Sequence, residues 1–260
     1  MKKILIIFSF LFLWFPGVSH AALTTNIVSY YKLDESSGNA ADSVGGVTLT
    51  NNGSATYSAG KINNGVSLSG SASQYLSASD NATTDTPTTA ITVAGWYKAT
   101  SSFVSQPIVS KNYSGSWTAP YASWLLRVDS STAIGFGLNL GGTFTNYEAT
   151  VPTMTAGTWY YIVGVYDGSH IYVYLNGVSQ GTPPAASGTI GYSTGTLMLG
   201  RDGSAAEVVN GMIDEVGIWS RALTSTEVTQ LYNSGAGLQY PFTTTPSIPW
   251  ILSSWIHWIF

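Results

Sequence analysis

The sequence contains no cysteine, and only 8% of its 260 residues are charged. Without cysteine, neither a disulfide bond nor a lipid-modified N-terminal cysteine can form, so stability must come from the hydrophobic core, with a metal ion as the remaining aid. The charged fraction lies far below the roughly 25% of an average globular protein. The polar surface must therefore come from Ser, Thr, Asn and the 28 glycines. The low charge is typical of a rigid extracellular β-protein, and the absence of cysteine is compatible with a secreted protein or a protein of the bacterial envelope.

Basic residues are especially few, because 9 Lys and Arg face 13 Asp and Glu, for a net charge of −4. If Lys2 and Lys3 are removed with the N-terminal segment, 7 basic residues remain against 13 acidic ones, and the net charge becomes −6. Binding to phosphate backbones needs a basic surface. We therefore expect no nucleic-acid partner.

The chain also lacks a long apolar segment near its start. The run over residues 4–15 has 12 residues, whereas a helix that crosses a bilayer needs about 20. Two lysines precede the run and small residues follow it, which is the layout of a secretory signal peptide cleaved after Ala21 or Ala22. We expect a signal peptide over residues 1–21, a folded domain over 22–240, and a protein that is secreted or held in the cell envelope of a bacterium.

A second apolar segment, residues 241–260, ends the chain, and its last eleven residues carry no charge. It is too short to span a bilayer. Three interpretations stay open: contact with a membrane interface, docking on the domain, or a shifted or truncated reading frame. Membrane contact is not the one we favour.

The stretch over residues 157–177 predicts a β-hairpin. Asp167-Gly168 marks its turn and Asn176-Gly177 closes the second strand, because glycine adopts the positive φ that tight hairpin turns require. Alternation places Tyr172 and Tyr174 on the face opposite Val173, where they stay open as ligand contacts. The positions that recur with a period of two, and that we expect to face the core, are Trp159, Tyr161, Val163, Val165, Ile171, Val173 and Leu175.

Short strands with glycine-rich or serine-rich turns between them are predicted along most of the chain. They cover residues 27–33, 47–50, 65–68, 74–77, 91–98, 107–110, 123–128, 134–138, 145–151, 196–200 and 211–219. One helix follows, with Thr224 and Glu227 as a capping box, Leu223 and Val228 as a hydrophobic staple, and Gly235 as the stop. The fold class is therefore all-β: a two-sheet antiparallel β-sandwich, or jelly roll, with one short C-terminal helix.

Several segments, in this order, resemble the LamG-like jelly-roll domains of the concanavalin A-like lectin/glucanase superfamily. The most specific part is the final Gly-x-Ile-Asp-Glu-Val strand that runs into Arg-Ala-Leu and a capped helix. The resemblance implies two stacked sheets with one concave face, on a scaffold whose members mostly bind glycans or proteins. The matching segments are YYKLDESSGN with ADSVGG, ITVAGWYK, GTWYYIVGVYDGSHIYVYLNGV, LMLGRD and NGMIDEVGIWSRALTSTEVTQLYNSG.

Some enzymes of that superfamily cleave glucans with carboxylates on alternate residues of one strand, and the E-x-D-x-x-E pattern of laminarinase-type enzymes is absent here. The adjacent pairs Asp34-Glu35 and Asp214-Glu215 should point to opposite faces, so neither supplies an acid and a nucleophile together. Carboxylates from distant strands, such as Glu148 and Asp167, stay open.

A second enzymatic motif, G-x-S-x-G, occurs at residues 191–195. The nucleophile elbow of serine hydrolases needs a helix after it and a histidine base elsewhere. The residues that follow predict a strand. We therefore interpret the match as a chance turn sequence.

Calcium is the cofactor that the sequence favours, in a structural role. The ion takes 6–8 oxygen ligands, and the resemblance implies that the first and last strands are neighbours, which would bring Asp34 near Asp214. Asp214 is the strongest candidate by resemblance, and Asp42, in an Asp-Ser-x-Gly turn, is a weaker third. The alternative is that Asp34 and Asp42 accept backbone N–H bonds in their turns, while Asp214 anchors the neighbouring strand.

For ligand binding, the loop over residues 112–124 places Tyr113, Trp117 and Tyr121 where no regular face would bury all three. Exposed aromatic rings stack on sugar faces and mark interfaces. The alternative is that they fold back under the loop as core residues. Trp96, Trp159 and Trp219 lie within strand patterns, and we expect them in the core.

These observations predict an exported, non-catalytic binding module, carbohydrate-binding or adhesive, for a glycan or a cell-surface ligand. The alternatives are a glycan-degrading enzyme, either a glycoside hydrolase or a lyase, and a purely structural module of the envelope.

Overall fold

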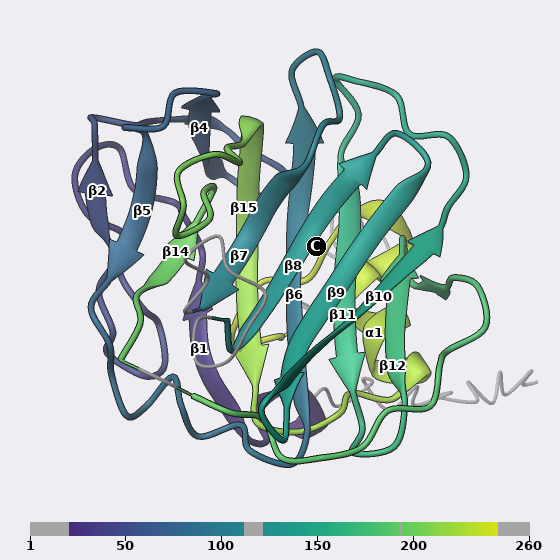
Figure 1. Cartoon of the computed structure of the whole chain (residues 1–260). Coiled ribbons are helices and arrows are strands. Elements are labelled where there is room, and N and C mark those ends of the chain that lie inside the picture. The colour runs from purple at the N-terminus through teal and green to yellow at the C-terminus, as the bar shows by residue number, and fades with distance from the viewer. Residues whose placement is uncertain (1–20, 112–121, 193, 244–260) are drawn as a thin grey trace, which may run out of the picture.

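The structure is a computed structural model, and it describes residues 21–111, 122–192 and 194–243. Two antiparallel sheets pack face to face, as the sequence predicts (Figure 1). The eight-stranded sheet contains β1 (Ile27–Tyr31), β3 (Thr56–Ala59), β4 (Asn64–Ser69), β6 (Ile91–Ala99), β11 (Tyr160–Tyr166), β12 (Ile171–Leu175), β13 (Val178–Ser179) and β15 (Asn210–Trp219). The seven-stranded sheet contains β2 (Thr50–Asn52), β5 (Tyr75–Ala78), β7 (Gln106–Lys111), β8 (Trp124–Ser130), β9 (Ala133–Leu140), β10 (Thr143–Thr150) and β14 (Leu197–Leu199).

The strand order confirms a jelly roll. The eight-stranded sheet runs β13-β12-β11-β6-β15-β4-β3, with β1 paired to β15 beside this path. The seven-stranded sheet runs β10-β9-β8-β7-β14-β5-β2. The first and last strands are thus hydrogen-bonded neighbours, as the resemblance implied. Two strands were not expected from the sequence, the short edge strands β3 and β13.

The main core lies between the two sheets and contains Ile162, Val173 and Phe136 among its fully buried side chains. A close approach of the sheets explains a glycine at the middle of β11. A Cβ atom at Gly164 would lie only 2.3 Å from the ring of Phe136 in β9. The aromatic ring therefore occupies the volume that any other residue at position 164 would need.

The predicted hairpin is present, but the positions expected to face the core lie on one face of the sheet in β11 and on the opposite face in β12. Val163 pairs with Tyr174 and Val165 with Tyr172 across the ladder, so these four side chains share the outer face of the sheet. Val173 and its alternates instead face the core between the sheets. Val163 and Val165 are buried as expected, but in a second hydrophobic cluster on the outer face of the sheet and not between the two sheets.

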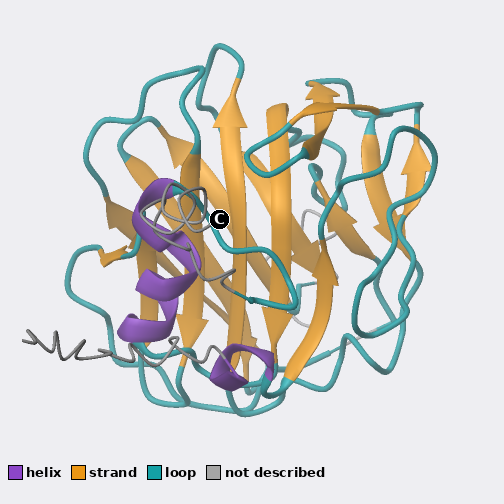
Figure 2. Ribbon diagram, turned by 180° about the vertical axis from the view of Figure 1, so that it is seen from behind, coloured by secondary structure: helices purple, strands orange, loops and turns teal. Residues whose placement is uncertain are grey.

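That second layer is built by the helix α1 (Ser225–Tyr232), which lies against the outer face of the eight-stranded sheet (Figure 2). The capping box of Thr224 and Glu227 forms as predicted. Leu223 and Val228 are both buried in an outer hydrophobic cluster that also contains Trp96 and Trp219. The helix ends earlier than expected, because Asn233 takes the left-handed conformation at φ 48° and caps it. Trp159 is only partly buried.

The packed region of the chain extends from the first described residues to Phe242. Leu23, in the short 3₁₀ helix η1 (Ala21–Thr24), is buried, and its carbonyl oxygen accepts the indole N–H of Trp219 at 2.7 Å. Phe242 is 2% exposed and packs edge-on against Tyr30, two residues beyond the expected boundary at 240. A second 3₁₀ helix, η2 (Asn233–Gly235), lies between α1 and this segment.

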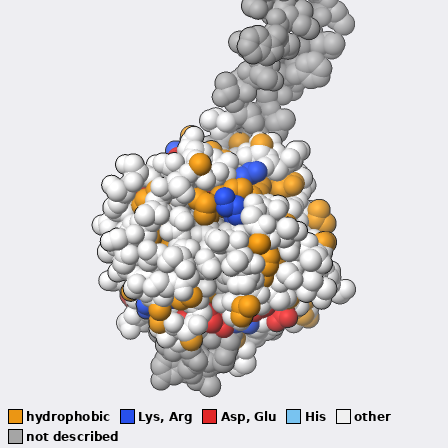
Figure 3. Space-filling model, turned by 90° about the horizontal axis from the view of Figure 1, so that it is seen from above, with side chains coloured by type: hydrophobic (Ala, Val, Ile, Leu, Met, Phe, Trp, Pro, Cys, Tyr) orange, Lys and Arg blue, Asp and Glu red, His pale blue; other side chains and the backbone are white. Residues whose placement is uncertain are grey.

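Uncharged groups dominate the surface. Seen from above, the molecule shows mostly uncharged side chains and backbone, with few charged residues among them (Figure 3). Among the described residues, no helix is long and apolar enough to cross a membrane. The signal-peptide and tail predictions fall on residues 1–20 and 244–260, which lie outside the described ranges.

Candidate functional site

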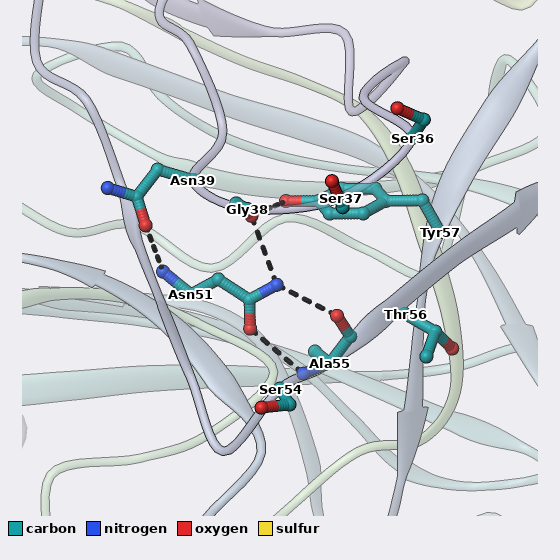
Figure 4. Close-up of a pocket in the computed structure, with 9 residues that line it drawn as sticks. All are labelled: Ser36, Ser37, Gly38, Asn39, Asn51, Ser54, Ala55, Thr56 and Tyr57. Atoms are coloured by element: carbon teal, nitrogen blue, oxygen red, sulfur yellow. Dashed lines mark hydrogen bonds between the residues drawn. The ribbon is translucent and has the colours of Figure 1, made fainter.

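A cavity of about 490 Å³ opens at one edge of the sandwich (Figure 4). It lies where β2, the edge strand of one sheet, continues through residues 53–55 into β3, the edge strand of the other. The loop after β1 forms the opposite wall. We call this cavity the edge pocket, and its lining residues are Ser36, Ser37, Gly38, Asn39, Asn51, Ser54, Ala55, Thr56 and Tyr57.

Asn51 holds the walls of the edge pocket together. Its side-chain amide donates to the carbonyl oxygens of Gly38 at 3.0 Å and Ala55 at 2.8 Å. Its side-chain oxygen accepts the backbone N–H of Ala55 at 2.9 Å. The backbone N–H of Asn51 donates in turn to the side-chain oxygen of Asn39 at 3.0 Å. Figure 4 shows these bonds converging on Asn51, so one side chain fixes the loop against the bend between the sheets.

The remaining polar groups of the edge pocket are free to bind a ligand. Within the described chain, no hydrogen bond engages the side-chain hydroxyls of Ser36, Ser37, Ser54 and Thr56. Tyr57 stands beside them, and its own hydroxyl is turned to the carbonyl oxygen of Gly38 at 3.0 Å. Since the lining contains no ionisable group other than Tyr57, the pocket offers hydroxyls and one aromatic ring without charge.

Sequence analysis did not identify this site. The signal was present in Asn52-Gly53, a dipeptide typical of hairpin turns. Gly53 has φ 65°, and a Cβ atom there would lie 2.2 Å from the backbone carbonyl of Ser73. The turn connects two strands that belong to different sheets, and sequence periodicity carries no information on that crossing.

The three residues of the predicted aromatic site, Tyr113, Trp117 and Tyr121, all belong to residues 112–121, outside the described ranges. The loop that contains them connects β7 to β8 in the seven-stranded sheet.

Two of the three predicted calcium ligands come together. Asp34 follows β1, and its charge contributes to raising the pKa of Asp214 in β15. One carboxylate oxygen of Asp214 accepts the backbone N–H groups of Lys61 at 2.7 Å and Ile62 at 3.0 Å. The other, Oδ1, is buried without a hydrogen bond of regular geometry, although the backbone N–H of Glu215 lies near enough to favour the ionised form of Asp214. A buried carboxylate oxygen without a regular hydrogen bond is costly, and a bound cation would remove that cost.

Glu215 belongs to the same cluster, which the sequence did not predict. A bulge interrupts the ladder of β15 between Asp214 and Gly217, and Glu215 has φ 51°. Strict alternation therefore fails at this point. The carboxylate of Glu215 accepts hydrogen bonds from the hydroxyl of Tyr30 and the side-chain amide of Gln239. The amide of Gln239 also donates to Asp34 at 2.9 Å.

The acids of this cluster have no positive partner. Burial raises the pKa of Asp214 to about 8 and that of Glu215 also to about 8. Within the described residues no ion pair reaches Asp34, Asp214 or Glu215. Asp214 is 0% and Glu215 2% exposed, so substrate cannot reach this pair.

Asp42 has the role that the sequence offered as its alternative. Its carboxylate accepts the backbone N–H groups of Tyr30 at 3.0 Å, Val44 at 2.9 Å and Val47 at 3.2 Å. In the described parts of the chain, no group of three or more His, Cys, Asp or Glu side chains has the arrangement of a metal site. A calcium ion at Asp214 would therefore need backbone carbonyl oxygens among its ligands, which calcium accepts.

One pair of carboxylates in the structure favours an enzymatic function, and the pair suggested by the sequence does not. On the outer face of the seven-stranded sheet, Arg127 pairs with Asp129 at 2.6 Å and with Glu207 at 3.6 Å. Burial raises the pKa of Asp129 to about 6, and it also raises the pKa of Glu207. Glu148 and Asp167, by contrast, belong to different sheets, in β10 and in the turn after β11.

The G-x-S-x-G motif is followed by a strand. Ser193 lies outside the described residues, while the segment that follows it is β14. A nucleophile elbow requires a helix in that place. The strand predicted there is confirmed.

Fold and site together define a class: a jelly-roll β-sandwich with a polar, uncharged pocket where its two sheets meet. A family model described as the concanavalin A-like lectin/glucanases superfamily matches residues 69–229. The chain belongs to this superfamily, as the resemblance indicated. No curated protein sequence matches the chain.

Similar solved structures include domain 4 of AbnA, a GH43 extracellular arabinanase from Geobacillus stearothermophilus, in complex with arabinotriose. It is 20% identical, with a TM-score of 0.60, over 78% of this chain and 97% of that domain. A structure of botulinum neurotoxin type C, a toxin whose cell entry is dependent upon interaction with two ganglioside molecules, is 12% identical, with a TM-score of 0.63, over 83% of this chain and 53% of its own.

The binding domain of Paraclostridial Mosquitocidal Protein 1 gives a TM-score of 0.62 at 12% identity, over 81% of this chain and 52% of its own. The chain thus spans about half the length of these two toxin structures. At such identities, the likeness concerns the fold.

Proposed function

We propose that this protein is an exported, non-catalytic module that binds a neutral carbohydrate in the edge pocket. The observation that carries the proposal is the group of four unengaged hydroxyls beside the ring of Tyr57. A sugar presents hydroxyls that donate and accept, together with an apolar C–H face. The pocket matches both, with hydroxyls for the first and an aromatic ring for the second.

Two further observations support a carbohydrate ligand. The volume of about 490 Å³ lies within the range of about 300–1,000 Å³ usual for small-molecule sites. A domain of the same fold was solved with arabinotriose, which makes neutral pentose oligomers suitable first probes. Glycan contacts by Tyr113, Trp117 and Tyr121, expected from the sequence, are a second candidate site within the same proposal.

The test is a glycan array with the purified protein, followed by titration of any glycan that binds. Thr56→Trp fills the edge pocket, and Thr143→Trp places the same side chain on the edge strand β10 as a matched control. We expect Thr56→Trp alone to abolish binding. Binding that survives Thr56→Trp would locate the ligand elsewhere, with Tyr113, Trp117 and Tyr121 as the next candidates. Absence of any glycan ligand at high concentration would favour the structural envelope module.

Calcium binding is a separate part of the proposal, and Asp214 would supply its buried Oδ1 oxygen. Asp34 is the second candidate ligand, because its charge reaches Asp214. Asp42 is the weakest, since its two oxygens already accept three backbone N–H groups. The ion would be structural, because it would compensate the buried charge of Asp214 and Glu215.

A glycan-degrading activity is the alternative, and the pair Asp129 and Glu207 favours it. Both carboxyls have a raised pKa, which general acid catalysis requires. Release of reducing ends from a glycan that binds would establish the enzyme, and loss of this release in Asp129→Asn would locate its acid. We favour the non-catalytic module because Arg127 neutralises these carboxylates in the described structure.

A further inference from the structure

A second hollow, of about 280 Å³, lies on the outer face of the eight-stranded sheet, between the strand β12 and the start of α1. We call it the tyrosine groove. Tyr172 and Tyr174 form one wall, with ring centroids 6.4 Å apart and planes at 26°. Its volume is below the range usual for drug-sized ligands, so it suits one ring rather than an oligomer. Its other lining residues are Val165, Asp167, Ala222, Leu223, Thr224 and Ser225.

Asp167 gives the tyrosine groove a fixed negative charge. Partial burial opposes ionisation, but hydrogen bonds from Ser169, His170 and Tyr172 outweigh it and lower the pKa of Asp167. One oxygen accepts the N–H groups of Ser169 and His170, and the other accepts the hydroxyl of Tyr172 at 3.0 Å. The second oxygen has a lone pair left for a ligand, because a carboxylate oxygen accepts two bonds.

No cation of the described chain compensates this charge. Asp167 takes part in none of the ion pairs among the described residues. The basic residue next to the groove in sequence, Arg221, is held by Glu227 at 2.7 Å. The neighbouring ring of Tyr172 adds the negative face of an aromatic system, which attracts cations. The groove therefore complements a positive group.

The rest of the tyrosine groove complements a small polyhydroxylated ring. Within the described residues, the hydroxyls of Tyr174 and Ser225 make no hydrogen bond. Val165 and Leu223 are almost fully buried, so the apolar surface of the groove comes from the partly exposed ring of Tyr172 and from Ala222. A ligand that presents an ammonium group, hydroxyls and a C–H face would meet a matching group for each.

We propose that the tyrosine groove is a second subsite, which binds an amino sugar through its protonated amine. The amine lies against Asp167 and Tyr172, while the sugar hydroxyls bond Tyr174 and Ser225. This proposal shares its ligand class with the proposed function, but it uses none of the edge-pocket residues. The module would then have two carbohydrate sites of different charge preference.

The test compares glucosamine with N-acetylglucosamine, because the two differ in the charge of one nitrogen. The full chain, labelled with ¹⁵N, is titrated with each sugar at a pH below the pKa of the ligand amine. We expect glucosamine to shift the amide signals of residues 167–174 and 224–226, with at least tenfold weaker binding of N-acetylglucosamine. Signals of residues 36–57 report on the edge pocket in the same spectra, so failure of one site is distinguishable from failure of the other.

Asp167→Asn is the deciding variant, since asparagine retains the oxygen that accepts the turn N–H groups. We expect it to weaken glucosamine binding at least tenfold, whereas Glu148→Gln, an equal loss of charge on the exposed edge strand β10, leaves it unchanged. Circular dichroism checks that both variants are folded. Equal affinity for the two sugars, or unchanged binding by Asp167→Asn, overturns the proposal. Tighter binding of an Nα-acetylated lysine amide than of glucosamine also overturns it, in favour of a peptide ligand.

Discussion

The hydroxyl of Tyr57 donates a hydrogen bond of 3.0 Å to the carbonyl oxygen of Gly38, and this bond joins the edge strand β3 to the loop after β1. The ring is thereby held as a wall of the edge pocket (Figure 4). The hydroxyl is already hydrogen-bonded within the protein, so the contribution of Tyr57 to ligand binding should come from the ring.

Substitution of Tyr57 separates the role of its ring in ligand binding from the role of its hydroxyl in the hydrogen bond to Gly38. We expect Tyr57→Ala to weaken binding of a neutral glycan about tenfold, because an aromatic contact contributes about 0.5–1.5 kcal/mol and 1.4 kcal/mol is a factor of ten. Tyr57→Phe retains the ring and should bind within about threefold of the original protein. Titration calorimetry measures both. Equal losses in the two variants would contradict a stacking role.

Asn51 should determine the shape of the edge pocket. Asn51→Ala removes three side-chain hydrogen bonds, which we expect to lower the free energy of unfolding by about 1–3 kcal/mol. Asn51→Asp retains the acceptor for Ala55 but places a carboxylate oxygen against the carbonyl oxygens of Gly38 and Ala55, so its effect should be at least as large. Thermal unfolding checks the order of the two variants, and a midpoint unchanged in Asn51→Ala would contradict this role.

Stability should depend on pH through Asp214 and Glu215. Burial raises the pKa of each to about 8, whereas carboxyls in an unfolded chain titrate near 4. The folded protein therefore binds more protons between these values, so their contribution is fully present below about pH 4 and is lost as the pH rises through 8. In metal-free buffer we expect the free energy of unfolding to fall by a few kcal/mol between pH 5 and 8, since one pKa unit is about 1.4 kcal/mol.

Variants identify the acids responsible. Asp214→Asn and Glu215→Gln should each flatten this dependence in urea titrations, because a neutral amide does not ionise as the pH rises. A slope that stays the same in Asp214→Asn would show that other groups produce it.

Calcium should stabilise the protein through the same cluster, and this stabilisation should increase as the pH rises. The ion binds the ionised carboxylate, so we expect it to raise the melting temperature more at pH 8 than at pH 5. Asp214→Asn should abolish the increase, and Asp42→Asn should retain it if calcium binds at Asp214 and Asp34. An unchanged midpoint of the original protein in excess EDTA and in added calcium would remove the calcium proposal.

Local sequence rules predicted the elements of this fold well. Alternation and turn dipeptides located both strands of the hairpin and the long strand β15, and the capping box located α1. They did not predict which sheet face a strand buries. Val163 and Val173 both fit a buried pattern, but one packs under the helix and the other between the sheets, and sequence periodicity is the same for both layers.

The sites were less predictable, because each depends on segments distant in sequence. Asp34 and Asp214 were brought together through the family resemblance, while the partnership of Glu215 with Tyr30 depends on a bulge that strand alternation excludes. The edge pocket depends on Asn51, a residue with no distinctive local pattern. Its role follows from the contact between two loops.

The lengths of the outermost strands have a consequence for solubility. An exposed strand edge can recruit a strand from another molecule, and very short edges limit this. Among the described residues, four of the five outermost strands are short: β13 with two residues, β2 with three, β3 with four and β1, which pairs with β15 alone, with five. The fifth, β10, has eight. Self-association of a protein that has no cysteine to secure its fold should therefore begin along β10, where Glu148 places a charge in the path of an incoming strand.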